Sequence, residues 1–120
     1  MISAFQWVLI LFGIISGSIG GILVKLGTRE LSYDQQFAGI VWSVATNYKI
    51  LIALFMYFMP FVIWLFLLKR MDLSRLQPLF SLVYVLTPLL AIAILGEKIS
   101  VNRWLGIALI LAGVLTVSRS

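Results

Sequence analysis

The sequence predicts an all-α membrane protein, a bundle of four transmembrane helices. Apolar residues make up 62% of its 120 positions and charged residues only 11%, whereas soluble domains are roughly one-quarter charged. A soluble domain of this length could not hide so much apolar surface from water. The apolar residues also gather in four runs of about 20, the length that an α-helix needs to cross a ~30 Å hydrocarbon core.

The predicted spans are residues 4–26, 50–68, 76–95 and 101–117, and we expect residues 1–120 to form a single domain. No basic segment precedes the first run and three further runs follow it, so we interpret it as a span and not as a cleavable signal peptide. The links after the second and third spans are short, which predicts antiparallel neighbours. The link over residues 27–49 is longer. Its apolar middle is too short to span, and we expect it to lie at the membrane interface or to cover the mouth of a groove.

Composition excludes several kinds of function. The chain has no cysteine and no histidine, so we expect no disulfide, no metal site and no cofactor. The net charge is +5, but the basic residues stand singly or in pairs at the ends of apolar runs. This distribution indicates contacts with lipid headgroups and not with nucleic acid. Basic residues are nearly balanced on the two sides, so either a partner decides the orientation or the chain inserts both ways and forms an antiparallel homodimer.

The first span carries small residues on one face. Gly13, Gly17 and Gly21 follow one another at four-residue steps, a spacing that lets another backbone come close. We expect this face to be buried in protein, either for packing alone or as a sliding surface. Ser18 and Lys25 extend the same side. Lys25 either reaches the headgroups or points inward, where it would bind a phosphate or carboxylate.

The third span has one partly polar stripe, which includes Gln77, Ser81, Tyr84 and Pro88. Polar groups in hydrocarbon need internal partners or water, so the stripe should face the bundle or a wet cavity. Pro88 frees a carbonyl and is expected to kink the helix. That carbonyl either serves a substrate or is satisfied by Thr87 or another neighbour.

The end of the third span carries Glu97, three residues before Ser100, the predicted N-cap of the fourth helix. We interpret Glu97 as a structural anchor. In the fourth span, Gly106 and Gly113 are two turns apart and predict a helix contact, within the chain or between subunits. No acid lies at the centre of a span, which argues against proton-coupled export of cations. The four acids are Glu30, Asp34, Asp72 and Glu97.

The segment from Leu67 to the C-terminus resembles the last two helices of an EamA-like half in the drug/metabolite transporter superfamily. The matching pieces are the Pro78 to Ser81 entry with Tyr84, "LGEKIS", "RWLG" and "LILAGV", and the first span also fits. Among short four-helix members, the chain most resembles the subunits proposed to flip aminoarabinose-linked undecaprenyl phosphate. Small multidrug resistance exporters are similar in size, but their hallmark glutamate in the middle of the first helix is absent here.

The resemblance implies a multi-pass transporter of the bacterial inner membrane and not an enzyme. It further implies a dimer, formed with an identical or a similar four-helix subunit, because longer relatives contain two such halves. The expected substrate is a polyprenyl-phosphate-linked sugar or a similar anionic amphipathic lipid, moved by alternating access.

In this hypothesis Lys25 attracts the phosphate, while Gln77, Ser81 and Tyr84, with Ser18, contact the polar head. Pro88 supplies a hinge or an open carbonyl, and the glycine faces allow rocking. Two alternatives are an exporter of small metabolites or cationic drugs, coupled through Glu97, and a scaffold subunit that transports nothing.

Overall fold

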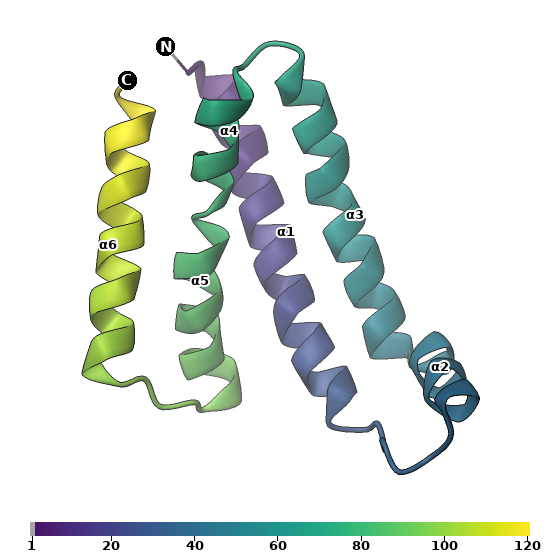
Figure 1. Cartoon of the computed structure of the whole chain (residues 1–120). Coiled ribbons are helices and arrows are strands. Elements are labelled where there is room, and N and C mark those ends of the chain that lie inside the picture. The colour runs from purple at the N-terminus through teal and green to yellow at the C-terminus, as the bar shows by residue number, and fades with distance from the viewer. Residues whose placement is uncertain (1) are drawn as a thin grey trace.

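The computed structural model describes residues 2–120 and consists of helices joined by short links (Figure 1). Four helical segments are long and apolar enough to cross a membrane, as predicted. Successive spans run antiparallel, with the start of α1, the end of α6 and the α3–α4 link at one end and α2 at the other (Figure 1). We call the latter the α2 end. The elements are α1 (Ala4–Thr28), α2 (Phe37–Thr46), α3 (Tyr48–Leu68), α4 (Leu73–Phe80), α5 (Val83–Leu90), the π-helix η1 (Ala91–Leu95) and α6 (Val101–Ser118).

Helix α1 packs against α3 on one side and α4 and α5 on another. It begins with a capping box, in which the Ser3 side chain accepts from the Gln6 N–H and the Gln6 side chain accepts from the Ser3 N–H. The predicted small-residue face is buried in protein. A Cβ placed on Gly20 would lie 3.3 Å from the Met56 Cβ, so α1 and α3 approach as closely as this glycine permits.

The third span is interrupted, although we predicted one helix with a kink at Pro88. The α-helix stops at Phe80, and α5 starts after a turn at Ser81 and Leu82. Backbone bonds around this turn run to the third preceding residue, from Ser81 to Pro78 and from Leu82 to Leu79. The Ser81 hydroxyl also donates to the Pro78 carbonyl, a local bond that competes with the α-helical pattern.

Helix α5 continues through Pro88 and changes to the π-helix η1 three residues later. The π-helix ends at Gly96, whose φ of 69° lies in the left-handed region that glycine adopts without strain. The chain then crosses to α6, which Ser100 caps by accepting from the Arg103 N–H. This sharp end of η1 places Glu97 next to the first turn of α6.

Helix α2 forms from the apolar middle of the long link and packs against α3. Its aromatic residues Phe37 and Trp42 are exposed. No residue of α2 lines any of the hollows described below, so the structure does not support the expectation that this segment covers the mouth of a groove. Its exposed aromatic surface fits the other expectation, a place at the membrane interface.

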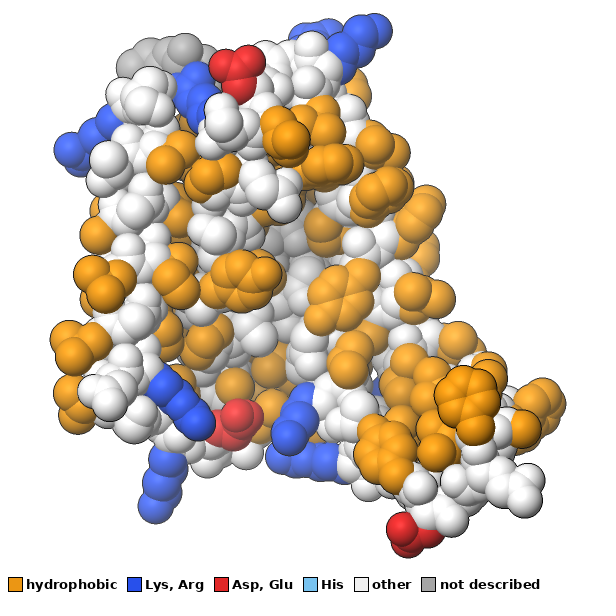
Figure 2. Space-filling view, viewed as in Figure 1, with side chains coloured by type: hydrophobic (Ala, Val, Ile, Leu, Met, Phe, Trp, Pro, Cys, Tyr) orange, Lys and Arg blue, Asp and Glu red, His pale blue; other side chains and the backbone are white. Residues whose placement is uncertain are grey.

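The outer surface of the bundle is apolar along its sides. Figure 2 shows hydrophobic side chains over the sides and Lys and Arg side chains near the two ends. The buried core is small and includes Ile10, Leu67, Leu76 and Leu79, while most large apolar side chains of α3 and α6 are exposed. This distribution is expected for helices whose solvent is lipid.

Candidate functional site: a groove along the first helix

Three hollows follow one another along α1 and share lining residues. The first is lined from Gly21 to Lys25 of α1, the second by Gly17 and Gly21, and the third from Gly13 to Gly17. We call this series the groove. Figure 2 looks onto a face of the molecule that is hollowed between two ridges of side chains. The groove therefore extends from the α2 end toward the end that carries the termini.

The hollow at the α2 end, which we call the mouth, has a volume of about 510 Å³. This is within the range of roughly 300–1,000 Å³ for small-molecule sites. Three charged residues line it, Lys25 from α1, Glu97 from the link after η1 and Arg103 from α6. All three are exposed. Its other walls are mainly apolar side chains of α5, η1 and α6.

The middle of the groove lies between two tyrosines, Tyr57 of α3 and Tyr84 of α5. Its floor is glycine, and a Cβ placed on Gly21 would lie 3.4 Å from the Tyr57 hydroxyl and 3.5 Å from the Thr87 methyl carbon. Tyr57 was not among the predicted site residues. A usable signal was present, because Tyr57 carries a hydroxyl in the middle of the otherwise apolar second span.

The far hollow, of about 680 Å³, brings together Gln77, Ser81 and Tyr84 as the stripe predicted. One polar atom of the Gln77 side chain is already hydrogen-bonded within the protein. Its Oε1 accepts a hydrogen bond of 2.9 Å from the Trp64 Nε1 of α3. Ser81 donates to the Pro78 carbonyl. The hydroxyls of Tyr57, Ser74 and Tyr84 and the amide NH₂ of Gln77 also line this hollow, and they make no hydrogen bond within residues 2–120.

The residue predicted to bind the phosphate, Lys25, lies away from the residues predicted to contact the rest of the headgroup. Lys25 lines the mouth, whereas Gln77 and Ser81 line the hollow at the other end of the groove. One small headgroup cannot touch all three at the same time. Ser18 lines none of the hollows; it is fully buried, and its Oγ accepts a 3.1 Å hydrogen bond from the Thr87 hydroxyl. Ser18 thus joins α1 to α5 by this hydrogen bond and does not line the groove as a headgroup contact.

The predicted glycines fall into two groups. Gly13, Gly17 and Gly21 line the groove against α3, α4 and α5. Gly106 and Gly113 of α6 have no atom within 4 Å of a Cβ built on them. Their predicted helix contact is therefore not made with another helix within residues 2–120. Pro88 lines both the mouth and the middle hollow.

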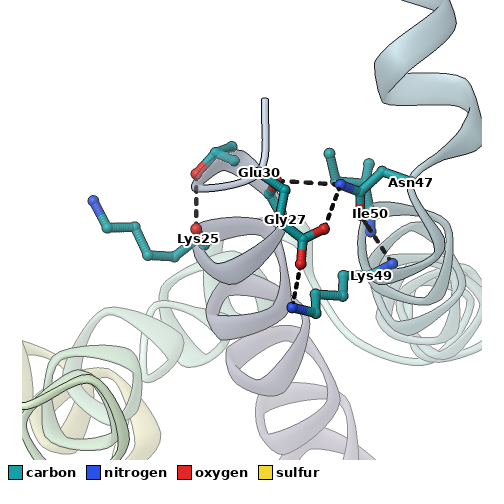
Figure 3. A network of polar contacts seen from close by, with 7 residues as sticks. Lys25, Gly27, Glu30, Asn47, Lys49 and Ile50 are labelled. Atoms are coloured by element: carbon teal, nitrogen blue, oxygen red, sulfur yellow. Dashed lines mark hydrogen bonds and ion pairs between the residues drawn. The ribbon is translucent and has the colours of Figure 1, made fainter. Parts of the chain in front are cut away.

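The network next to the mouth holds α1 to α3 without engaging Lys25. Glu30 pairs with Lys49 at 2.5 Å, and Asn47 donates to the Gly27 carbonyl and to Glu30 (Figure 3). Figure 3 shows the Lys25 side chain extending away from this pair. The hydrogen bond that the Lys49 ammonium donates to Glu30 holds the pKa of the Glu30 carboxyl below its ordinary value.

Within residues 2–120, no group of three or more His, Cys, Asp or Glu side chains is placed to hold a metal ion. The chemistry that the groove offers is recognition by charge and hydrogen bonding, with two cations and one carboxylate at its mouth.

Comparison with known proteins identifies relatives over nearly the whole chain. The family described as "EamA-like transporter family" matches residues 3–119. A protein of Pseudomonas savastanoi pv. phaseolicola, named "Probable 4-amino-4-deoxy-L-arabinose-phosphoundecaprenol flippase subunit ArnE", is 27% identical over 113 residues, which are 94% of this chain and 96% of that relative. No solved structure is similar enough to match.

Other relatives with the same printed name match over shorter segments. The protein of Pseudomonas fluorescens is 37% identical over 68 residues, 57% of this chain and 60% of that relative. The protein of Yersinia pestis is 40% identical over 57 residues, 48% of this chain and 50% of that relative. These matches confirm the resemblance to EamA-like transporters.

Proposed function

Because the chain belongs to the EamA-like transporter family, we propose that it moves a polyprenyl-phosphate-linked sugar, or a similar anionic amphipathic lipid, across the bacterial inner membrane. Membership makes it a transporter and not an enzyme. Together with its four long apolar helices, membership also makes it a multi-pass inner-membrane protein. The printed names of its relatives supply the lipid class of the proposal.

The observation that carries the proposal is the groove with its charged mouth. A lipid with a phosphate head needs a polar path for the head and access to lipid for its tail. The groove supports both needs. Lys25 and Arg103 stand at its mouth, hydroxyl and amide groups follow at Tyr57, Tyr84 and Gln77, and the surrounding walls are apolar.

In the proposed path the head passes from the mouth to the far hollow, and it does not bind all the predicted residues together. Lys25 attracts the phosphate first, and Tyr84, Ser81 and Gln77 contact the head later. The tail stays in the bilayer beside the open face of the groove. Alternating access would come from rocking along the glycine-lined contact of α1, with the irregular third span, interrupted at Ser81 and bearing Pro88, as the segment that bends.

We also propose that two subunits form the working unit and that each chain contributes a single domain. Gly113 lies on a helix that is largely exposed and has room for a neighbouring helix, whereas Gly106 of the same helix lines the mouth of the groove. Small residues at such positions allow close helix contacts in lipid. The partner is an identical chain or a similar four-helix subunit.

A transport assay tests the proposal. The protein, purified from membranes with any subunit that copurifies, is reconstituted into liposomes containing a polyprenyl-phosphate sugar whose outer-leaflet fraction is measured with a membrane-impermeant reagent. We expect protein-dependent flipping that falls at least about tenfold in Lys25→Ala, since a charged contact contributes on the order of 1.5–3 kcal/mol. Lys98→Ala is the matched control because Lys98 is exposed and lines none of the hollows.

Three results would overturn the proposal. Flux of a cationic drug without flux of the lipid would indicate the exporter, and no flux of either would indicate a scaffold. Equal loss of lipid flipping in the Lys25 and Lys98 variants would remove the role of the mouth.

The two-subunit arrangement has its own test. The sequence contains no cysteine, so Gly113→Cys introduces a single thiol. A cross-linker that joins this thiol to any nearby residue of a neighbour should give a two-subunit product for Gly113→Cys, whether the neighbour is an identical or a similar chain. It should give none for Phe58→Cys, an exposed position on α3. Cross-linking from both positions, or from Phe58→Cys alone, would contradict a specific contact through α6.

A further inference from the structure

The middle hollow of the groove connects its two ends. It shares Gly21, Thr87 and Pro88 with the mouth, and it shares Gly17 and Tyr57 with the far hollow. Among residues 2–120, none lines both the mouth and the far hollow. The middle hollow is also the smallest of the three, at about 450 Å³ against about 510 and 680 Å³. A head that moves along the groove therefore has to pass through its smallest part.

The two walls of the middle hollow meet the floor at Gly21. The Tyr57 ring lies against α1, because a Cβ on Gly20 would be 3.5 Å from its Cδ2 and a Cβ on Gly21 would be 3.4 Å from its hydroxyl. On the α5 side, the Cγ2 methyl of Thr87 would be 3.5 Å from the same Gly21 Cβ. The Thr87 hydroxyl donates to the buried Ser18, which fixes the direction of that methyl. One methyl group at position 21 would thus contact both walls at once.

Packing does not require glycine at position 21. Contacts of 3.4 and 3.5 Å are ordinary van der Waals distances, so an alanine would fit without displacing its neighbours. Gly20 differs, since its added Cβ would lie 3.3 Å from the Met56 Cβ and 3.4 Å from a backbone oxygen. Alanine is also the better helix former. Gly21 therefore leaves open a space between Tyr57 and Thr87 that folding does not need.

We infer that the middle hollow is a neck that limits the size of the head that passes, with Gly21 as the specificity-determining residue between Tyr57 and Thr87. The inference rests on the proposed function and adds a steric limit that is independent of the charge of the head. In close-packed surroundings one additional methyl group is enough to obstruct the occupant. The Tyr57 hydroxyl makes no hydrogen bond within the part of the chain that the structure describes, so it is available to the head during passage.

Four proteins test the neck: the wild type, Gly21→Ala, Thr87→Ser and the double variant. Each is reconstituted in liposomes with a polyprenyl-phosphate sugar, and the initial flipping rate is measured. Gly21→Ala should slow flipping at least about fivefold, the low end of the cost of one extra methyl in a filled space. Thr87→Ser removes the wall methyl but keeps the hydroxyl that donates to Ser18, so the double variant should recover most of the wild-type rate.

Recovery in the double variant separates the neck from the contact between helices. If Gly21→Ala slowed flipping by hindering α1 against α3, a change on α5 would not restore the rate. Val62→Ile is the control for added bulk. It adds one carbon at an exposed position of α3 that lines none of the three hollows, and it should leave the rate unchanged.

The size of the head provides a second measurement. A lipid that carries one further sugar should be flipped at least about fivefold more slowly by the wild-type protein. Thr87→Ser should reduce this difference by raising the rate of the larger lipid. Thermal melting in detergent identifies any variant that fails to fold. If Gly21→Ala or the double variant fails, the effect of Thr87→Ser on the two lipids decides.

The outcomes separate the two proposals. If the wild-type protein flips neither lipid, the proposed function fails. The function stands and the neck is refuted if the wild-type protein flips both lipids at the same rate, if Gly21→Ala keeps the wild-type rate, or if the folded double variant stays as slow as Gly21→Ala. An unchanged ratio of the two lipids in Thr87→Ser refutes the neck as well.

Discussion

The hydroxyl of Ser16 donates a hydrogen bond of 2.7 Å to the carbonyl oxygen of Met56 across the contact between α1 and α3. Pro60 stands four residues after Met56 inside α3. Because proline has no N–H, it cannot give this carbonyl its helical partner. Ser16 supplies the missing donor, which is how membrane helices tolerate an internal proline.

The first prediction concerns this bond. Ser16→Ala leaves a carbonyl without a donor in an apolar environment and should lower the free energy of unfolding by about 1–2 kcal/mol. Pro60→Ala restores the backbone N–H at position 60, so Ser16→Ala should cost less in that background. Reversible unfolding in mixed detergent micelles gives the free energy of unfolding of the wild type, the two single variants and the double variant. An equal cost of Ser16→Ala with and without Pro60 would show that the bond does not compensate for the proline.

The second prediction concerns the two groups of glycines. Gly20→Val adds atoms where a Cβ would already lie 3.3 Å from the Met56 Cβ and 3.4 Å from the Ala53 carbonyl oxygen. We expect it to destabilise the fold by about 1–3 kcal/mol. Gly113→Val is the control, because nothing lies within 4 Å of its added Cβ, and it should leave the unfolding of the isolated chain nearly unchanged. Similar losses in both variants would contradict the packing described for α1.

The third prediction concerns Asn47, which joins two spans. Its side chain accepts from the N–H groups of Lys49 and Ile50 at the start of α3 and donates to the Gly27 carbonyl near the end of α1. Asn47→Ala removes an N-cap and should cost about 0.5–2 kcal/mol. Asn102→Ala, at an exposed position of α6, should cost much less. Denaturant unfolding in micelles gives the midpoints of the Asn47→Ala and Asn102→Ala variants. Equal midpoints would contradict a stabilising N-cap at Asn47.

The fourth prediction concerns pH. The pKa of Glu30 is lowered from its ordinary value of 4.5, chiefly by the hydrogen bond from Lys49. A carboxyl with a lowered pKa stabilises the folded state above that ordinary value, and the contribution disappears as pH falls through the folded-state pKa. Lys49→Met should therefore lower the melting temperature at neutral pH but not at a pH below the folded-state pKa of Glu30, where the carboxyl is protonated. Lys69→Met is the control, since Lys69 lies at the opposite end of the bundle, and a Lys49→Met deficit that persisted in acid would refute the contribution of the pair.

Much of the candidate site was visible in residue spacing. The four-residue steps of Gly13, Gly17 and Gly21 indicated a close helix contact, and the stripe from Gln77 to Tyr84 indicated a polar face. Both features repeat with the period of a helix, so each could be recognised within a single span. The interruption at Ser81 could not be placed in this way, because Pro88 indicated a kink seven residues further along and no spacing signal marked Ser81.

The amino-acid sequence alone determined that this chain spans a membrane four times and which side of α1 and of the third span would avoid lipid. Those properties depend on the solvation of apolar and polar groups, which is local in the chain. Only the tertiary structure decided that Glu97 and Arg103 share a cavity with Lys25, that Tyr57 lines the groove and that Ser18 is buried. Periodicity defines a face of one helix, but the rotation and axial position of neighbouring helices follow from how their side chains pack.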